Sequence, residues 1–275
     1  MFDLNNKVIL VVGGRGYLGR HFCQKLRSQG GQIISADMQA PSNAASKSDF
    51  KTEFDDIDQI DIDVTNTESI ATVVQSVMDK YGRIDVLIYS VTAKPEDFYA
   101  PFTECSLQGW QKVFSAEMDG LFLVTQQVGQ VMEKAKRGNI ILLSSIYGVV
   151  GNDQRIYEGA NLSTLYAGKN LHAGKIQRLY SHAAYPAVKG GVISLARYLA
   201  AYWEGQNIRV NCISPGGVEH SGENQKFVEQ YSSHVPLGRK AKIDEISGPI
   251  VFLASDESSY VNGHNLIVDG GWTAW

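Results

Sequence analysis

Residues 7–19 read KVILVVGGRGYLG, and this stretch decides the fold. The run Lys7–Val12 has the apolar, β-branched composition of a buried strand, and a glycine-rich turn follows it directly. In such a turn, glycine allows a tight reversal, a close approach of the backbone to a pyrophosphate, and a helix packed against the sheet. The amides that begin this helix would face the phosphates. The turn therefore predicts a dinucleotide site formed by Gly13, Arg15, Gly16, Tyr17, Leu18 and Gly19; a glycine-rich turn without a ligand is the alternative.

Short apolar runs alternate with amphipathic stretches along the rest of the chain. The strand candidates are Val8–Val12, Ile33–Ala36, Val86–Val91, Ile140–Ser144, Ile208–Ile213 and Asn265–Val268. The helix candidates span residues 17–29, 66–81, 106–136, 184–203 and 243–254. Strands that are apolar throughout indicate a parallel sheet covered on both faces. The order predicts a three-layer α/β fold with a doubly wound parallel sheet of about seven strands, a Rossmann fold.

The composition is that of a globular protein without a strong charge imbalance. The chain has 275 residues, a formal net charge of -4 and no linker or repeat, so we expect one domain over residues 1–275. The charge gives no reason to expect a nucleic-acid partner, and no apolar run approaches the roughly 18 residues of a membrane span. Cys23, Cys105 and Cys212 are isolated, which indicates a reducing compartment without disulfides or a metal site. The first residues do not have the pattern of a signal peptide, so we expect a cytoplasmic protein.

An acidic residue closes the second strand. Asp37 follows Gly19 by 18 residues, where a carboxylate can accept hydrogen bonds from the adenosine ribose hydroxyls. A carboxylate there would also repel a 2′-phosphate, which favours NAD over NADP as the cofactor. Asp63 and Val64 follow the third strand and are candidates for contact with the adenine edge. The alternative for both acids is a solvated position at the end of a strand.

A tyrosine and a lysine lie one helical turn apart in residues 185–189, YPAVK. Proline is tolerated in a first turn, so Pro186 predicts a helix that begins near Tyr185 with its positive end toward the phenol. A nearby cation and a helix N-terminus both lower the pKa of a phenol, which suits it to acid–base work near neutral pH. Upstream, the strand at 140–144 ends in two serines, and Ser145 could donate to a substrate oxygen at the carboxyl edge of the sheet. Taken singly, each of these residues could be structural.

The ordered motifs resemble the short-chain dehydrogenase/reductase family along nearly the whole chain. They are VVGGRGYLG, the acid closing the second strand, Asp63-Val64, IILLSS, YPAVKGG, IRVNCISPGG and LASDESSYVNGHNLIVDGG. The stretches IYGVV, IYEG and YPAVK, with the long polar segment between them, also resemble the branch associated with flagellin glycans and nonulosonic sugars.

The resemblance implies hydride transfer between a nicotinamide and a carbon that bears a hydroxyl or carbonyl group. It implies that Tyr185 is the general acid/base and that Ser145 holds and polarises the reacting oxygen. Lys189 would bind the nicotinamide ribose and favour the phenolate. Further cofactor contacts are implied at Ser90, Pro215, Gly216, Gly217 and Val218.

Four positions depart from the pattern of the family. Tyr17 stands where many members have a glycine, and the spacing of the glycines in this turn is closer to that of epimerase-like members. Ser90 lies in the sequence YSVT, where the family usually has NNAG. His220 stands where a threonine often meets the nicotinamide carboxamide.

The fourth departure is Glu117, which stands at the usual asparagine position in the helix predicted at 106–136. Val113 and Leu121 lie one turn away on either side, so Glu117 should face inward. A buried carboxylate needs a partner. We hypothesise that Glu117 pairs with Lys189, directly or through water, and replaces the asparagine in a proton relay. A glutamate bonded only to backbone is the alternative.

Ser145 and Tyr185 are 40 residues apart, whereas family members commonly have a much shorter connection. The excess, at about 152–183, should line or cover the substrate pocket. Its cations outnumber its acids by two, and it adds three tyrosines and two histidines. These residues are Arg155, Lys169, Lys175 and Arg178, against Asp153 and Glu158, with Tyr157, Tyr166, Tyr180, His172 and His182. The composition suits a polar substrate with a phosphate or carboxylate; a solvated excursion or an oligomer contact is the alternative.

We therefore expect an NAD-dependent oxidoreductase that acts on a secondary alcohol or ketone of a sugar-like or sugar-phosphate-like molecule. An NAD-retaining epimerase or dehydratase is one alternative, favoured by the glycine spacing. A catalytically silent dinucleotide-binding regulator is another, favoured by the altered asparagine positions. The resemblance implies a homodimer or homotetramer built partly on the helices at 106–136 and 184–203.

Overall fold

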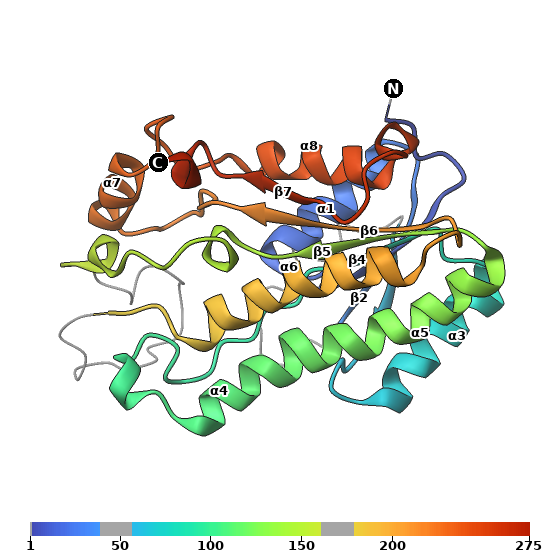
Figure 1. Ribbon diagram of the computed structural model, residues 1–275, viewed down its shortest axis with the longest axis horizontal. Coiled ribbons are helices and arrows are strands. Elements are labelled where there is room, and N and C mark those ends of the chain that lie inside the picture. The colour runs from blue at the N-terminus through green and yellow to red at the C-terminus, as the bar shows by residue number, and fades with distance from the viewer. Residues whose placement is uncertain (1, 39–56, 161–178) are drawn as a thin grey trace.

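Seven parallel strands form the centre of the structure (Figure 1). The computed structural model describes residues 2–38, 57–160 and 179–275. Across the sheet the strand order is β3-β2-β1-β4-β5-β6-β7. The bounds are β1 (Val8–Val12), β2 (Gln32–Asp37), β3 (Asp58–Asp61), β4 (Val86–Tyr89), β5 (Gly138–Leu143), β6 (Ile208–Pro215) and β7 (Asn265–Val268). The predicted doubly wound parallel sheet is confirmed.

Helices cover both faces of the sheet and complete three layers (Figure 1). One face carries α1 (Tyr17–Ser28) and α8 (Ile243–Ala254). The opposite face carries α3 (Thr67–Tyr81), α4 (Leu107–Phe114), α5 (Gly120–Ala135) and α6 (Ala184–Tyr202). The short helix α7 (Gln225–Ser233) lies at the end of the molecule toward which β6 and β7 point.

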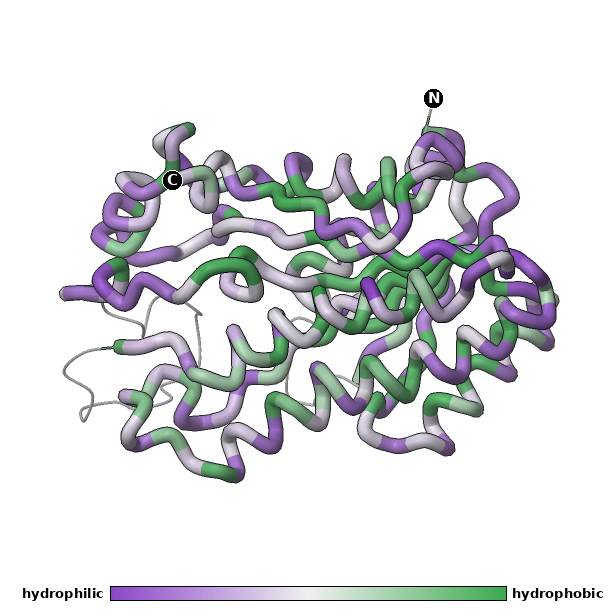
Figure 2. The backbone as a smooth tube through the Cα atoms, viewed as in Figure 1, coloured by the Kyte–Doolittle hydropathy of each residue, from purple (hydrophilic) through white to green (hydrophobic). Residues whose placement is uncertain are grey.

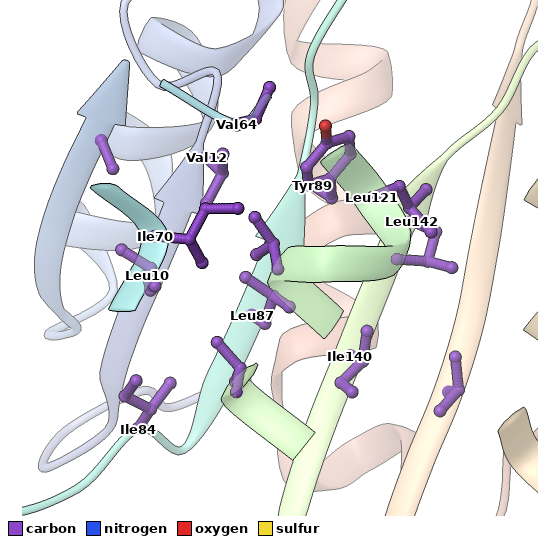
Figure 3. Close-up of a cluster of buried hydrophobic side chains, with 14 of the residues drawn as sticks. Leu10, Val12, Val64, Ile70, Ile84, Leu87, Tyr89, Leu121, Ile140 and Leu142 are labelled. Carbon is purple, nitrogen blue, oxygen red and sulfur yellow. The ribbon is translucent and has the colours of Figure 1, made fainter. Parts of the chain in front are cut away.

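Alternate strand residues supply two separate cores. Leu10 and Val12 pack with α3, α5 and α6, and Figure 3 shows them beside Ile70 and Leu87. Ile9 and Val11 point the other way and pack with α1 and α8. Because the strands β1, β4 and β5 are buried on both faces, their sequences are apolar, which is visible as a green centre in Figure 2.

The boundaries predicted from sequence differ from the structure by a few residues. The strand expected at 86–91 ends at Tyr89, and the strand expected at 140–144 spans Gly138–Leu143. Helix α7 was not predicted, because only Phe227 and Tyr231 of its nine residues are buried and its apolar pattern is short. Among the described residues, no helix has the length and apolar character to span a bilayer.

The helix predicted at 106–136 contains one turn of different geometry. Between α4 and α5, residues Ser115–Asp119 form a π-helical turn, so the element runs on without a break but with a local widening. Hydrophobic periodicity did not reveal this turn, because the residues on both sides of it remain helical.

The carboxyl ends of the strands meet along one edge of the sheet. The strand order reverses between β1 and β4, which is where doubly wound folds bind ligands. The glycine-rich turn follows β1, the YSVT stretch follows β4 and the serine pair follows β5. The topology therefore brings the predicted cofactor and catalytic segments to one place.

Candidate active site

The glycine-rich turn has a backbone that tolerates no side chain at its key positions. Gly13 has a φ of 85°, and a Cβ there would lie 2.6 Å from the carbonyl oxygen of Ser90. A Cβ on Gly19 would lie 2.0 Å from the carbonyl oxygen of Gly13. Gly16 precedes α1, and no side chain caps the amides of the first turn. This close-packed loop with an uncapped helix start fits a dinucleotide pyrophosphate.

The carboxylate of Asp37 is fixed beside this turn. Its Oδ2 accepts the backbone N–H of Arg15 at 2.9 Å, and its Oδ1 accepts the N–H of Met38 at 2.8 Å. The guanidinium of Arg15 is paired with Asp61, with Nη1 and Oδ1 2.6 Å apart, and Nε donates to Oε1 of Gln59 at 2.9 Å. Nη1 also donates to the Met38 carbonyl at 3.1 Å. A carboxylate at the end of β2 therefore stands where a ribose would be recognised, while the cation beside it is already paired.

The other residues expected around the adenosine have local roles in the structure. Asp63 is exposed, and its Oδ1 accepts the N–H and the hydroxyl of Thr65, at 2.9 and 2.7 Å. Val64 is buried against the start of α5. Ser90 follows β4, and its N–H donates to the carbonyl of Val12 at 2.8 Å. These contacts place all three residues at the carboxyl edge.

The segment after β6 is held on both sides. The N–H of Gly216 donates to Val268 at 2.9 Å, and the N–H of Gly217 donates to the Tyr231 hydroxyl. Val218 bridges to Ala241. Pro215, the last residue of β6, leads into this anchored turn.

Tyr17 joins the glycine-rich turn to the segment after β6. Its hydroxyl donates to the carbonyl of Glu219, and its ring lies against His220 with centroids 4.6 Å apart. Two segments that are 202 residues apart in sequence are therefore in contact beside the predicted cofactor site. Tyr17 and His220 are separate departures from the family pattern in the sequence, and their contact was not predicted.

Tyr185 and Lys189 lie on the first turns of α6, as the proline position predicted. Lys189 is buried, and its Nζ lies 5.5 Å from the centroid of the Tyr185 ring. The end of β5 holds the same helix: Nζ donates to the Leu143 carbonyl at 3.2 Å, and the Ser144 hydroxyl donates to the Lys189 carbonyl at 2.8 Å. Ser145 is buried and directly follows, and its Oγ accepts the N–H of Tyr147 at 3.2 Å. Hydrogen bonds therefore join the end of β5 to the helical turn that carries Tyr185 and Lys189.

Glu117 forms an ion pair with Lys189. The distance between Glu117 Oε2 and Lys189 Nζ is 2.9 Å, and both side chains are at most 3% exposed. Glu117 Oε1 accepts the N–H of Ala93 at 2.9 Å. Burial, the largest single effect, would lower the pKa of Lys189, but the Glu117 carboxylate and Tyr185 together outweigh it and raise the pKa, so the lysine is charged. Whether Glu117 acts in a proton relay stays a prediction.

The π-helical turn explains how Glu117 reaches this position. The N–H of Gly120 donates to the Ser115 carbonyl, five residues back, and the Ala116 carbonyl instead accepts the hydroxyl of Tyr89. A Cβ on Gly120 would lie 2.7 Å from that hydroxyl, so glycine is required for the tyrosine to approach. Burial raises the pKa of Tyr89 well above its usual value, with Glu117 adding to the effect, so the hydroxyl is a donor.

The segment predicted to line the substrate site is described in part. Residues 161–178, which include Lys169, Lys175, Arg178, Tyr166 and His172, lie outside the described residues. Arg155 is engaged by Asp153 through two of its nitrogens, with an Nη2–Oδ2 distance of 2.7 Å. This pairing removes Arg155 as an unpaired cation for an anionic substrate.

A cluster of aromatic residues lies beyond the serine pair. Tyr157 stacks on Phe227 with centroids 5.5 Å apart, and Tyr231 stacks on Trp272 at 4.6 Å. Together with Ile146 they belong to a third buried cluster, separate from the two cores of the sheet. Neither α7 nor Trp272 was predicted as part of this cluster; the spacing of Phe227 and Tyr231, one helical turn apart, was the available signal.

The fold and the site define a dinucleotide-binding oxidoreductase of the Rossmann type. The chain belongs to the short-chain dehydrogenase family. The family model described as "short chain dehydrogenase" matches residues 7–160, and the model described as "Enoyl-(Acyl carrier protein) reductase" matches residues 171–273.

Two curated relatives match nearly the whole chain. D-threitol dehydrogenase of Mycolicibacterium smegmatis is 30% identical over 99% of this chain and 95% of its own. Post-translational flagellin modification protein A of Campylobacter coli is 29% identical over 98% of this chain and 99% of its own.

Solved structures give the same fold. A short-chain dehydrogenase of Leptospira borgpetersenii with bound NAD+ has a TM-score of 0.81 at 28% identity, covering 98% of this chain and 94% of its own. A gluconate 5-dehydrogenase of Burkholderia cenocepacia in complex with NADP and tartrate has a TM-score of 0.78 at 25% identity, covering 100% of this chain and 98% of its own. Related folds therefore bind either NAD or NADP.

Proposed function

We propose that the protein oxidises a secondary alcohol of a sugar-like molecule, or reduces the corresponding ketone, with NAD as the hydride carrier. The observation that carries the proposal is the placement of Tyr185 beside the buried Lys189–Glu117 pair, at the strand end that leads to Ser145. When bound, the nicotinamide accepts or donates the hydride. Tyr185 takes the hydroxyl proton during oxidation and returns it during reduction, and Ser145 donates a hydrogen bond to the same oxygen.

The test is turnover of NAD with a panel of polyols, sugars and sugar phosphates. Tyr185→Phe and Ser145→Ala should each lower kcat by about 100-fold or more, because each removes a group that acts at the reacting oxygen. Both variants should keep the wild-type dissociation constant for NADH. Unchanged kcat in Tyr185→Phe would contradict the proposal.

The choice of NAD over NADP rests on Asp37 and Arg15. A ribose 2′-phosphate would meet the Asp37 carboxylate, and the Arg15 side chain that could offset the charge is held by Asp61. Replacing Asp37 with serine should raise the ratio of kcat/KM for NADP to that for NAD by roughly tenfold or more. An unchanged ratio would contradict this assignment.

We propose that Glu117 keeps Lys189 positively charged and passes protons from this lysine along a proton relay. The ion pair and the Ala93 contact support this role. In Glu117→Gln the lysine keeps a neighbour of the same size without the negative charge. The pH–rate profile should change in this variant; an unchanged rate and profile would remove Glu117 from the mechanism.

An enzyme that retains its NAD, such as an epimerase or dehydratase, is the second candidate. The contact of Tyr17 with Glu219 and His220 favours it, because this contact closes over one side of the cofactor site and would slow exchange. Such an enzyme converts its substrate without net formation of NADH and would be purified with bound cofactor. Accumulation of NADH in proportion to product would exclude it.

A polyhydroxylated substrate is supported by two relatives whose names refer to threitol and gluconate. Since Arg155 is paired, Lys169, Lys175 and Arg178 are the remaining cations of the segment at 152–183 that could bind an anionic group of the substrate. If replacing these three with alanine leaves the substrate KM unchanged, they do not bind an anionic group of the substrate. The free thiols of Cys23, Cys105 and Cys212 support a cytoplasmic location.

A further inference from the structure

His182 lies three residues before Tyr185 and has no solvent-exposed surface. The N–H of Ala184 donates to Nδ1 of His182 at 3.1 Å, and the N–H of Tyr185 donates to the His182 carbonyl at 3.1 Å. The first N–H groups of a helix have no acceptor within the helix, so His182 satisfies two of them at the start of α6. It therefore fixes the backbone from which the Tyr185 side chain extends.

The hydrogen bond to Nδ1 determines the tautomer of His182. Because Nδ1 is an acceptor, the neutral ring carries its proton on Nε2. Nε2 faces Oδ1 of Asp97 at 3.9 Å, which is too far for a direct hydrogen bond but places a carboxylate opposite the N–H. Oδ2 of Asp97 accepts the N–H of Ser106 at 2.6 Å, so this carboxylate is anchored at the start of α4. Burial lowers the pKa of His182, against the opposing effect of Asp97, so the ring is neutral.

The ring of His182 also supports the phenol through Phe98. His182 and Phe98 are stacked, with centroids 6.0 Å apart and 8° between their planes. Phe98 meets the ring of Tyr185 edge-on, with centroids 6.2 Å apart and planes at 78°. Tyr185 thus has two ring contacts of different kinds: the Lys189 ammonium, and a phenylalanine that His182 holds in place.

We propose that His182, acting with Phe98 and Asp97, is the positioning residue of Tyr185: it fixes both the backbone and the ring of the proton-transferring tyrosine without touching the substrate. The proposal rests on the proposed function, since only that function makes Tyr185 the acid/base. His182, Phe98 and Asp97 lie outside the motifs that carry the family resemblance, and their contacts alone support this role.

The arrangement itself is tested without any turnover. Long-range ¹H–¹⁵N spectra of the wild-type imidazoles should show His182 as a neutral ring protonated on Nε2. Amide exchange at Ala184, whose N–H donates to the His182 side chain, should accelerate at least about tenfold in His182→Ala. Asparagine is a good N-cap residue, so His182→Asn should restore the slow exchange. A ring protonated on Nδ1, or amide exchange that His182→Ala leaves unchanged, would overturn the proposal even if the wild type turns over no substrate.

The kinetic consequence is tested on a substrate of the wild-type enzyme. His182→Ala should lower kcat by roughly 10- to 100-fold, because a misplaced catalytic group reacts slowly, while the substrate KM and the NADH dissociation constant stay near wild type. His182→Asn should recover part of kcat, and Phe98→Leu, which keeps the cap but loses the ring contact, should lie between the two. Ile250→Val, a truncation in the core on the opposite face of the sheet, is the control for lost stability. Equal losses of kcat in His182→Ala and the control would show that His182 is only structural.

Discussion

At the scale of single residues, the buried pair of Lys189 and Glu117 dominates the site. Folding removes both charges from water, and each charge is stabilised by the other, with Lys189 Nζ and Glu117 Oε2 2.9 Å apart. Because the pKa of Lys189 in the folded protein lies above that of an unfolded lysine, the pair stabilises the fold fully below the unfolded value of 10.5. That stabilisation is lost as the pH rises through the folded pKa.

Removing one partner of this pair should be costly at neutral pH. We predict that Glu117→Gln lowers the free energy of unfolding at pH 7 by about 3–5 kcal/mol, because it leaves a buried ammonium without a counter-charge. Urea denaturation measures the change. The double variant Glu117→Gln/Lys189→Met should recover much of the loss, since it buries no charge. Equal stability of Glu117→Gln and wild type would contradict the geometry.

Asp153 gives a second prediction, with the opposite pH dependence. The hydrogen bonds from Arg155, opposed by burial, lower the pKa of Asp153 from 3.8 to about 2. Its ionised form therefore stabilises the fold above pH 3.8, and this contribution is lost as the pH falls through about 2. Asp153→Asn should unfold at lower urea concentration than wild type at pH 7, and the difference should shrink on acidification. A difference that stays constant with pH would contradict the pairing.

At the scale of elements, the π-helical turn joins three separate features of the sequence. Tyr89 at the end of β4 donates its hydroxyl to the Ala116 carbonyl within the turn, Gly120 at the start of α5 leaves room for this hydroxyl, and Glu117 lies between Ala116 and Gly120. Val64, Tyr89 and Leu121 lie close to this turn, as Figure 3 shows. Through Glu117, the π-helical turn therefore supports the active-site residue Lys189.

Replacing Gly120 with alanine tests this coupling. Its Cβ would lie 2.7 Å from the Tyr89 hydroxyl and 2.9 Å from a Val64 methyl group, so both side chains must move. We expect a loss of about 1–3 kcal/mol in the free energy of unfolding, together with lower kcat. The matched control is Gly151→Ala, at an exposed glycine where a Cβ meets nothing within 4 Å, and its free energy of unfolding should stay within about 0.5 kcal/mol of wild type. Equal effects of the two substitutions would show that the turn is not under this constraint.

The sequence was sufficient for most of the elements, but not for β3, α7 or this turn. The ranges predicted for the strands β1 and β7 and the helix α8 match their observed bounds; β1 is buried along its whole length, which leaves a strong apolar pattern. The inward direction of Glu117 also followed from helix periodicity. The π-helical turn, the contact of Tyr17 with His220 and the role of His182 depend on residues far apart in sequence, which no local pattern contains.

At the scale of the whole molecule, the exposed surface of the long helices bears on assembly. Tyr198 and Tyr202 of α6 are 63% and 60% exposed and stack on each other, and Phe122 of α5 is 52% exposed. Large apolar side chains on neighbouring helices favour a contact between copies. These are the helices on which the family resemblance placed a dimer or tetramer.

We therefore predict that light scattering on the purified protein gives the mass of a dimer or tetramer. Charge at the contact should oppose assembly, so Phe122→Glu combined with Tyr198→Glu should shift the mass toward the monomer. Leu237→Glu, at an exposed apolar residue away from both helices, is the control and should keep the assembly. A monomeric wild type would contradict this prediction and leave the site unaffected.

The proposed transfer of a hydride to NAD, with Tyr185 taking the proton, is tested most directly by a measurement that follows the hydrogen itself. A polyol carrying deuterium at its carbinol carbon is incubated with NAD, and mass spectrometry detects deuterium in the products. We predict that the deuterium appears in NADH in proportion to the ketone formed, and that Tyr185→Phe slows this transfer about 100-fold or more. Deuterium that is returned to the substrate carbon, lost to water, or transferred equally fast by Tyr185→Phe would contradict the claim.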